Sequence, residues 1–431
     1  MNRLLTISLL LLLPLGCRGE REPWADKATV VFKHGKAAGA NTIKELILRF
    51  EDRNPDIRVI EEILPATTDE QHQFYVTNLE GRSSDFDVMA LDVIWTPEFA
   101  QAGWLDDLSG RLSDDEISKF LKGPVVADTY NGRLYAVPWY VDAGVLYYRK
   151  DLLEKYGLDP PSTLEELVAS ARKVLEAEKD PHLYGFVWQG KQYEGLVCVA
   201  LEFIRGNGGE ILNAQGECRL NDPRVTGALG FMRDLIHKYN VSPPLVTTAD
   251  EESTRHTFGL GRALYMRNWP YAWNLFQEQG SEVKGLVGVT AMPSFSDNTG
   301  NRGVATLGGW QLGINKHSRH PDAAWRFVEF MTGYESQKAL AIDAGYKPAR
   351  TAVYSDPELI NKQPFIVDLY PIIASARPRP VTPFYMMMSQ VLQSEFSAAI
   401  NGIRTPRRAV SRADRQIAYI LELSRLWKQR G

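Results

Sequence analysis

Short β-branched runs alternate with amphipathic helical segments along most of this 431-residue chain, and this alternation is the strongest constraint on its fold. The first run is 28–33, and the apolar residues of 43–50 then follow the spacing of one helix face. Further strands are predicted at 57–60 and 86–91, with a helical segment between them. Because strands joined by helices usually pair in parallel, the pattern predicts an α/β fold with much parallel sheet.

Capping and turn motifs predict where several elements begin and end. Residues 42–45 and 162–165 each have Thr or Ser at the first position and Glu at the fourth, the pattern of a capping box that starts a helix. Asn-Gly at 131–132 predicts a tight hairpin turn, and the strand that follows is expected to end at Pro138. Pro321 is expected to open a later helix.

The N-terminus has the composition of a secretory signal. Arg3 precedes a ten-residue apolar run at 4–13, and the small residue Gly16 follows it. The run is too short to span a bilayer as a stable helix. Residues 1–16 therefore predict a signal peptide and an extracytoplasmic protein, in the periplasm or at the cell surface.

Cys17, directly after Gly16, gives this segment two possible interpretations. In the first, the segment is a lipobox, Cys17 is acylated, and residues 17–27 are a lipid anchor and polar tether that hold the protein to a membrane. In the second, the signal is an ordinary cleaved one and Cys17 has no role. Pro14 and Leu15 depart from the common lipobox pattern, so the sequence leaves both open.

Composition excludes several function classes. The net charge is −4 and no long basic run is present, so nucleic acid is not an expected partner. No catalytic motif of the hydrolase, zinc-protease or P-loop type occurs, and we expect no enzyme activity, no cofactor and no metal. Cys198 and Cys218 either form a disulfide, which an extracytoplasmic location permits, or are two separate core residues.

Five groups of motifs resemble, in order, the extracellular solute-binding proteins of sugar ABC importers, most closely their trehalose/maltose-binding branch. They are FDVMALDVIW (86–95) with FAQAGWL (99–105); GRLYAVPW (132–139), Asp142, YYRKDLL (147–153) and PSTLEEL (161–167); FVWQGKQYEGL (186–196) with NGG (207–209); NWPYAW (268–273); and LGGWQL (307–312) with KPAR (347–350). Together they cover nearly all of the chain after the signal.

The resemblance implies a two-lobed, periplasmic-binding-protein-like fold of type II with three inter-lobe crossings. Lobe 1 is expected to comprise 28–141 and 305–348, and lobe 2 to comprise 142–304 and 349–431. A sugar, a disaccharide of the trehalose or maltose type, is expected to bind between lobes that close by a hinge motion. The expected partners are a permease pair with its ATPase, and the protein is expected to be a monomer.

Two acids are candidate ligand-binding residues by this resemblance. Asp92 lies just past a predicted strand, where α/β sheets place ligands, although it is equally placed to cap the next helix. Asp142 lies at a predicted lobe crossing, and its alternative role is a hydrogen bond that stabilises the hinge. Carboxylates suit sugars because they accept two hydroxyl hydrogen bonds at once.

Aromatic residues and one arginine complete the predicted site. Trp269, Tyr271 and Trp310 are candidate stacking platforms for a sugar ring, with core packing as the alternative, and Gly309 allows close approach of the backbone to a ligand or serves a hinge. Arg379 resembles a ligand-binding arginine of the family; the alternatives are Arg377 in its place, or two surface arginines.

The loop expected at 33–41 departs from the family pattern, because Lys33, His34 and Lys36 stand where small or acidic residues are usual. These residues lie either on the solvated rim or against an anionic group of the ligand. An anionic or amine-bearing solute is therefore the alternative ligand class. A glycosidase, with two carboxylates across the substrate, is a further alternative.

Overall fold

The computed structural model describes residues 27–35, 40–65, 68–213, 215–296 and 304–428. The predicted signal peptide, Cys17 and the tether up to residue 26 lie outside the described residues, as does Lys36. Within the described parts of the chain, no helix has the length and apolar character needed to cross a membrane.

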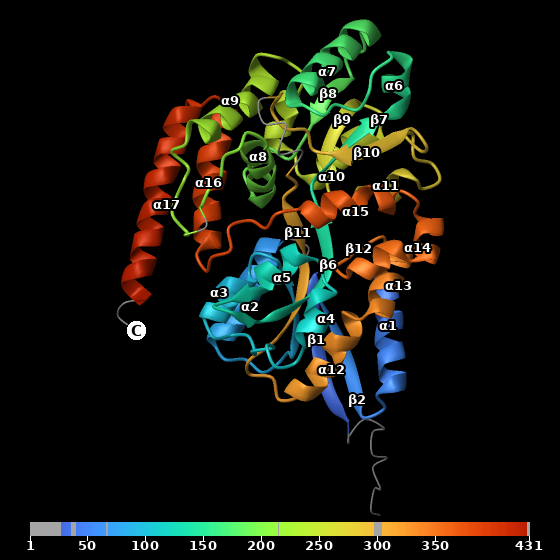
Figure 1. Ribbon diagram of the computed structural model, residues 1–431, viewed down its shortest axis with the longest axis vertical. Helices are drawn as coiled ribbons and strands as arrows, with labels where there is room; N and C mark the ends of the chain where they lie inside the picture. The colour runs from blue at the N-terminus through green and yellow to red at the C-terminus, as the bar shows by residue number, and fades with distance from the viewer. Residues whose placement is uncertain (1–26, 36–39, 66–67, 214, 297–303, 429–431) are drawn as a thin grey trace, which may run out of the picture.

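Two separate β-sheets divide the chain into two α/β units (Figure 1). The six-stranded first sheet has the order β12-β6-β11-β3-β1-β2, and the four-stranded second sheet has the order β10-β7-β9-β8. The strands are β1 (Ala28–Gly35), β2 (Ile57–Leu64), β3 (Val88–Asp92), β4 (Thr129–Tyr130), β5 (Arg133–Leu134), β6 (Ala136–Ala143), β7 (Val145–Arg149), β8 (Tyr184–Val187), β9 (Ala263–Asn268), β10 (Val287–Ala291), β11 (Leu307–Ile314) and β12 (Lys347–Pro348).

Helices surround both sheets. They are α1 (Ala40–Arg53), α2 (Thr68–Glu80), α3 (Thr96–Gln101), α4 (Asp114–Ser118), α5 (Lys122–Asp128), α6 (Lys150–Lys155), α7 (Leu164–Glu178), α8 (Glu194–Gly206), α9 (Pro223–His237), α10 (Glu251–Gly259), α11 (Ala272–Phe276), α12 (Pro321–Met331), α13 (Tyr334–Ala344), α14 (Pro357–Lys362), α15 (Ile366–Ser375), α16 (Tyr385–Ile400) and α17 (Pro406–Lys428).

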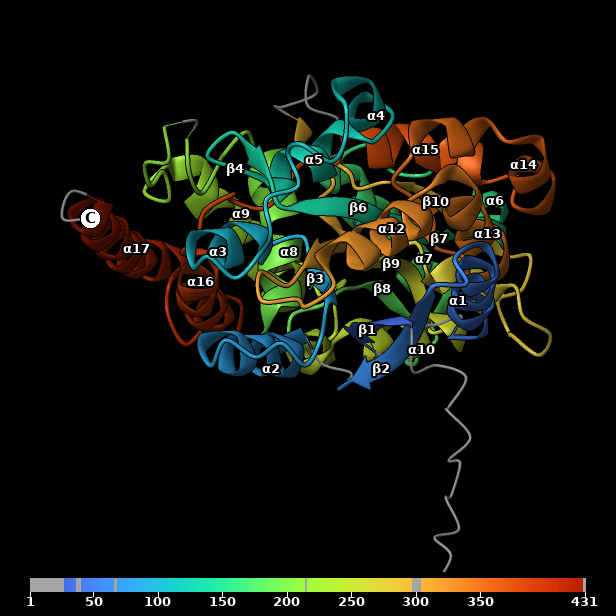
Figure 2. The same ribbon diagram turned by 90° about the horizontal axis from the view of Figure 1, so that it is seen from below.

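The first sheet is covered on both faces, which explains the apolar strands that the sequence shows. The ring of Phe32 on β1 lies 5.2 Å from that of Phe327 on α12, whereas the ammonium of the next residue, Lys33, lies 5.2 Å from the ring of Phe74 on α2. Since successive side chains of a strand point to opposite faces, α12 and α2 cover opposite faces of the sheet, as Figure 2 shows. Strand β1 pairs in parallel with β2 and β3. Strand β11 runs antiparallel to β3 on one side and to β6 on the other, so β6 points in the same direction as β3.

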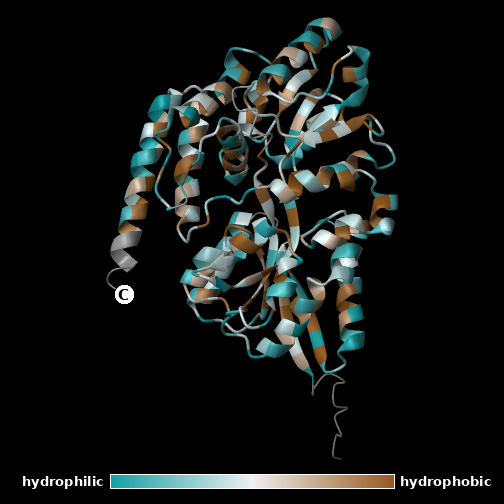
Figure 3. Cartoon of the chain, in the orientation of Figure 1, coloured by the Kyte–Doolittle hydropathy of each residue, from teal (hydrophilic) through white to brown (hydrophobic). Residues whose placement is uncertain are grey.

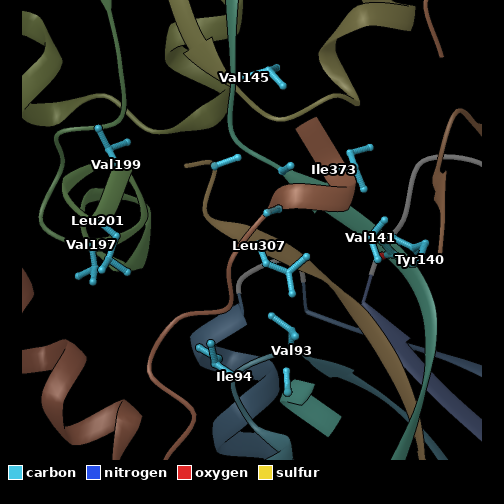
Figure 4. Packing of buried hydrophobic residues seen from close by; sticks show 14 of the residues in the cluster. Val93, Ile94, Tyr140, Val141, Val145, Val197, Val199, Leu201, Leu307 and Ile373 are labelled. Carbon is cyan, nitrogen blue, oxygen red and sulfur yellow. The ribbon is translucent and has the colours of Figure 1, made fainter. Parts of the chain in front are cut away.

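The chain passes from one sheet to the other where these long strands end. Gly144 alone separates β6 of the first sheet from β7 of the second, and Figure 4 shows Val141 and Val145 on either side of this passage. Residues 292–306 lead back from β10 to β11. After β12, residues 349–351 still bond to 119–121 of the first unit, so the last passage lies beyond the predicted boundary at 348.

Several predicted element boundaries are wrong by a few residues. Helix α1 begins at Ala40, so the residues 42–45 lie inside its first turns. The second capping box exists one residue later than predicted, between Thr163 and Glu166. Strand β6 continues through Pro138, although proline has no backbone N–H to donate to the neighbouring strand. The pairing with β11 shifts register between Trp310 and Gln311, and this irregularity accommodates the proline.

Other local predictions are confirmed. Asn131 and Gly132 have the positive φ angles of a tight hairpin turn, 48° and 76°, between β4 and β5. Helix α12 begins at Pro321. Cys198 and Cys218 are both free thiols: Cys198 is buried in α8, and the Cys218 thiol donates to Asp414 at 3.3 Å. The disulfide alternative is therefore not found in this structure.

Candidate functional site

The ends of three neighbouring strands in the first sheet bring most of the predicted site residues together. Asp92 is the last residue of β3 and lies opposite Trp310 of β11. On the other side of β11, Gly308 lies opposite Asp142 of β6. Because these strands are adjacent, the two acids and Trp310 share one edge of the sheet, next to the passages into the second unit.

An arginine joins Asp92 to the second unit. The Arg379 guanidinium donates to Asp92 Oδ1 and to Glu194 Oε1, both at 2.9 Å, and its side chain is only 4% exposed. Glu194 is the first residue of α8, and Tyr385 and Ser389 of α16 also donate to it. The carboxylate of Asp92 is thus connected through one guanidinium to two helices of the second unit.

The backbone before Arg379 is fixed, which explains why this arginine and not Arg377 points inward. Arg205 donates to the carbonyl oxygens of Arg377 and Pro378 at 3.0 and 2.7 Å. The backbone of Arg377 also exchanges hydrogen bonds with Ala305 of the 292–306 passage and with Leu307, the first residue of β11. The side chain of Arg377 is half-exposed and pairs with Glu210, so of the two predicted candidates only Arg379 reaches Asp92.

Asp92 does not cap the helix that follows it. The N-cap of α3 is Trp95, and no side chain caps that helix end. Asp92 Oδ1 instead accepts from the backbone N–H of Ile94 at 3.2 Å and from Arg379. With Oδ1 engaged twice, Oδ2 is the oxygen left to accept hydrogen bonds from a ligand.

Asp142 is partly exposed, and no donor among the described residues bonds to its carboxylate. Burial raises the pKa of Asp142 to about 7, although the charges of Lys347 and Arg267 act in the opposite direction. Lys347 is buried on β12 with its ammonium donating to Gly345 O at 2.6 Å, and burial lowers its pKa to about 8. The structure therefore does not show the predicted hinge hydrogen bond of Asp142, and its carboxylate is a free acceptor.

Trp269 stands between the second unit and β11. Its indole lies 4.1 Å from the guanidinium carbon of Arg267, and its Nε1 donates to Glu251 at 3.2 Å. A Cβ atom on Gly308 would lie 3.2 Å from the ring, so the glycine permits this approach. Since the guanidinium occupies one ring face, the half-buried indole offers only its other face to a ligand.

Of the remaining candidates, Tyr271 and Trp310 are half-buried and Gly309 is buried. The Tyr271 hydroxyl donates to Glu252 at 2.6 Å, and the Trp310 indole packs edge-on against Trp95 with ring centroids 5.7 Å apart. Gly309 has a φ of 123°, a conformation that suits glycine, and a Cβ atom there would lie 2.5 Å from Tyr140 O. The glycine is therefore required by close contact between β11 and β6.

A buried ion pair lies directly behind this site. The Arg267 guanidinium donates to both carboxylate oxygens of Glu202, at 2.9 and 2.6 Å, and both side chains are almost fully buried. Glu202 also accepts from the backbone N–H of Thr306, in the second passage. A Cβ atom on Gly144 would collide with both charged groups, so the pair contacts two of the passages.

Lys33 and His34 were predicted to lie in a loop, either on the solvated rim or against an anionic ligand, and both predictions are wrong. Lys33 and His34 belong to β1 and are buried. They pair with Glu62 and Glu61 of the neighbouring strand β2, so they neither lie on a solvated rim nor face a ligand.

Sequence reasoning missed four residues of this region. Glu194 holds Arg379, Lys347 lies near Asp142, and the rings of Tyr140 and Tyr346 stack 4.2 Å apart at the same edge of the sheet. Glu194 lies within the 186–196 motif, and an acid at the start of an apolar helix was the available signal. No group of acids, histidines or cysteines in the described part of the chain is arranged to hold a metal ion.

Comparison with known proteins gives consistent matches over most of the chain. The family model described as bacterial extracellular solute-binding protein matches residues 36–338. A probable ABC transporter-binding protein of Deinococcus radiodurans is 38% identical over 350 residues, 80% of this chain and 81% of the relative. A maltotriose-binding protein of Pyrococcus abyssi is 29% identical, over 71% of this chain and 63% of the relative.

Solved structures agree with these matches. The maltose-bound MalE3 protein of T. maritima is 42% identical and superposes with a TM-score of 0.84 over 91% of this chain and 100% of that one. A solute-binding protein of Thermotoga lettingae bound with α-D-tagatose is 26% identical, with a TM-score of 0.79 over 92% and 100% of the two chains. The predicted α/β, two-lobed fold of type II is therefore confirmed, and the extracytoplasmic location agrees with the matched family.

Proposed function

This chain belongs to the bacterial extracellular solute-binding proteins, those of the sugar ABC importers, and from this premise we propose that it captures a maltose- or trehalose-type disaccharide between its two lobes and delivers it to a permease with its ATPase. We take the first sheet with its helices as lobe 1 and the second sheet with α16 and α17 as lobe 2. In this proposal the protein carries out no reaction on the sugar.

The observation that carries this proposal is the row of acids and aromatic rings at the ends of β3, β11 and β6. The free carboxylate of Asp142 and Oδ2 of Asp92 accept hydroxyl hydrogen bonds, which are strong when the acceptor is charged. The open face of Trp269 and the ring of Trp310 supply flat apolar surface for the C–H face of a sugar. Arg379 holds the carboxylate of Asp92 in place by donating a hydrogen bond to its Oδ1.

The likeness to maltose-bound MalE3 supports a glucose disaccharide over other carbohydrates, since that protein is 42% identical to this chain over nearly its whole length. The protein from T. lettingae binds a monosaccharide at 26% identity. The anionic-solute alternative loses two of the three residues that motivated it, because Lys33 and His34 are paired with glutamates of β2.

Calorimetric titration with maltose, trehalose, maltotriose, glucose and tagatose tests the proposal. We expect the tightest binding for a glucose disaccharide and no turnover of the bound sugar. Trp269→Ala should weaken binding strongly, whereas Trp104→Ala, beside Lys316 just past the other end of β11, is the matched control. Absence of heat with every carbohydrate would refute the sugar assignment, and release of glucose from a bound disaccharide would favour the glycosidase alternative.

A further inference from the structure

A groove lined by arginines lies at the outer end of lobe 2, away from the sugar site. It has a volume of about 840 Å³ and is formed by the turn after α16 and the first turns of α17. Figure 1 shows this end of α17 at the upper left, whereas β1, where the described chain begins, lies at the lower end of the long axis. We call this surface the arginine groove, defined by Ile403, Arg404, Arg407, Arg408, Arg412 and Arg415.

Two of the five arginines are held in place by one buried acid. Glu395 of α16 accepts from Arg404 at 3.2 Å and from Arg412 at 2.9 Å, and its side chain is only 4% exposed. The other acid nearby, Asp414, accepts from the Cys218 thiol. These contacts give the groove a fixed wall.

The other three arginines have no acidic partner within the described part of the chain. Arg407, Arg408 and Arg415 are exposed, and no ion pair or side-chain hydrogen bond engages their guanidinium groups. The segment 401–415 contains five arginines and one aspartate, although the whole chain has a net charge of −4. The positive charge is thus concentrated at one place, and Figure 3 shows α17 as largely hydrophilic.

The residue type indicates which anion fits. The segment contains arginine and no lysine. A guanidinium presents a planar fork of donors that matches phosphate oxygens, whereas an ammonium is a point charge. The first N–H groups of α17 add positive potential at the same end of the groove. The groove therefore has the chemistry of a phosphate-binding surface.

An exposed apolar side chain distinguishes a lipid surface from a soluble phosphate. Ile403 is 75% exposed, the largest value for any large apolar residue of the described chain, and it stands among the arginines. A soluble anion contacts the guanidinium groups and leaves Ile403 in water. A phospholipid surface engages both, since basic residues pair with headgroups while an apolar residue enters the acyl boundary.

We propose that the arginine groove docks on the headgroups of anionic phospholipids, with Ile403 inserted between them. This inference does not depend on the sugar that the protein binds. Because the groove lies on the upper left flank of lobe 2 and β1 lies at the lower end of lobe 1, a groove contact together with the predicted anchor at Cys17 would bring both lobes to the membrane (Figure 1).

Vesicle co-sedimentation of the chain from Arg18 onward, which lacks both the predicted signal peptide and Cys17, tests this proposal. The vesicles contain phosphatidylcholine with or without 30% phosphatidylglycerol. Each basic residue near such a surface contributes about 1 kcal/mol, so Arg407→Gln/Arg408→Gln/Arg415→Gln should weaken binding on the order of 100-fold. Ile403→Ser should weaken it about tenfold.

The matched control is Arg49→Gln/Arg133→Gln/Arg172→Gln, which removes the same charge from three exposed arginines elsewhere and should change binding little. Salt at 0.5 M should release the protein. Equal losses in the control and groove variants would overturn the proposal, as would binding to uncharged vesicles alone. A further contrary outcome is that inorganic triphosphate binds equally well, in calorimetry, to the unmodified protein and to Ile403→Ser, while neither protein binds vesicles. The groove would then be a site for small anions, and the proposal would be overturned.

Discussion

We expect the free carboxylate of Asp142 to make sugar binding dependent on pH in a range where few carboxyl groups titrate. Burial raises the pKa of Asp142 to about 7, and none of the described residues donates a hydrogen bond that would stabilise its ionised form. An ionised carboxylate accepts two hydroxyl hydrogen bonds, whereas a protonated one loses part of this capacity. We therefore expect the sugar to bind the ionised form.

The magnitude follows from the fraction ionised. With a pKa of about 7, roughly nine in ten molecules carry the charge at pH 8 and about one in a hundred at pH 5. The dissociation constant should therefore increase by up to about 100-fold between these pH values. Lys347, whose pKa is lowered to about 8, stays protonated below pH 7, so the change between pH 5 and 7 belongs to Asp142.

Stability without ligand should change in the opposite direction. The folded-state pKa of Asp142 lies above its ordinary value of 3.8, so between pH 4 and 7 the native state binds more protons than the unfolded state. The free energy of unfolding contributed by this group therefore falls as the pH rises through that window, by at most about 4 kcal/mol. Acidification should therefore weaken sugar binding, and at the same time it should increase the free energy of unfolding of the ligand-free protein, because Asp142 becomes protonated in the native state.

Calorimetric titration and urea unfolding from pH 5 to 8 test both effects. Asp142→Asn should bind more weakly at pH 8 and lose most of the pH dependence of affinity and stability. Asp52→Asn, at an exposed aspartate of α1, is the matched control and should behave as the unmodified protein. An affinity that stays constant from pH 5 to 8, or a pH dependence that survives in Asp142→Asn, would refute the reasoning.

Three further substitutions have clear expectations. Arg267→Met leaves the charge of Glu202 buried without its partner and should lower the free energy of unfolding in urea by about 3–5 kcal/mol. The second substitution Glu202→Met in the same chain should recover much of this loss, and a loss below about 1 kcal/mol in Arg267→Met would contradict the argument. Glu194→Gln removes the charge that holds the site arginine and should weaken sugar binding about tenfold in calorimetry; unchanged affinity would count against its role. Gly309→Ala should cost about 2 kcal/mol or more in thermal unfolding, because φ is 123° there, whereas Gly110→Ala, with open space around it, should cost little; equal melting temperatures would disprove the strain argument.

The sequence contains enough information to predict the fold class and to place Asp92 at the end of a strand, although the end of β6 was expected too early, at Pro138. Asp92 and Trp310 are each adjacent to an apolar run, and residues at the ends of neighbouring strands meet at one edge of a sheet. The alternation of strands and helices predicts the parallel pairing of β1 with β2 and β3. These features depend on short segments whose pattern is local.

The remainder depends on contacts between distant residues. Glu194 and Arg379 are 185 positions apart, and no local pattern indicates that they pair. Lys33 ends the predicted strand 28–33 and begins the predicted loop 33–41, and nothing local to it indicates that Glu62 of β2 lies opposite its ammonium. The raised pKa of Asp142 likewise results from burial by elements that are remote in the sequence.

The proposed site and the passages between the lobes are made of the same short segments. Asp142 precedes Gly144 by two residues, Gly309 follows the 292–306 passage closely, and Arg379 follows the backbone pairing of Arg377 by two residues. A ligand bound by these residues would directly contact the segments whose dihedral angles must change when the lobes move. Because Glu202 bonds to the second passage and contacts the first, the buried ion pair behind the site ties both passages to lobe 2. If the ligand binds where we propose, binding and closure need no long-range pathway in this fold, since the ligand and the hinge would share neighbouring residues.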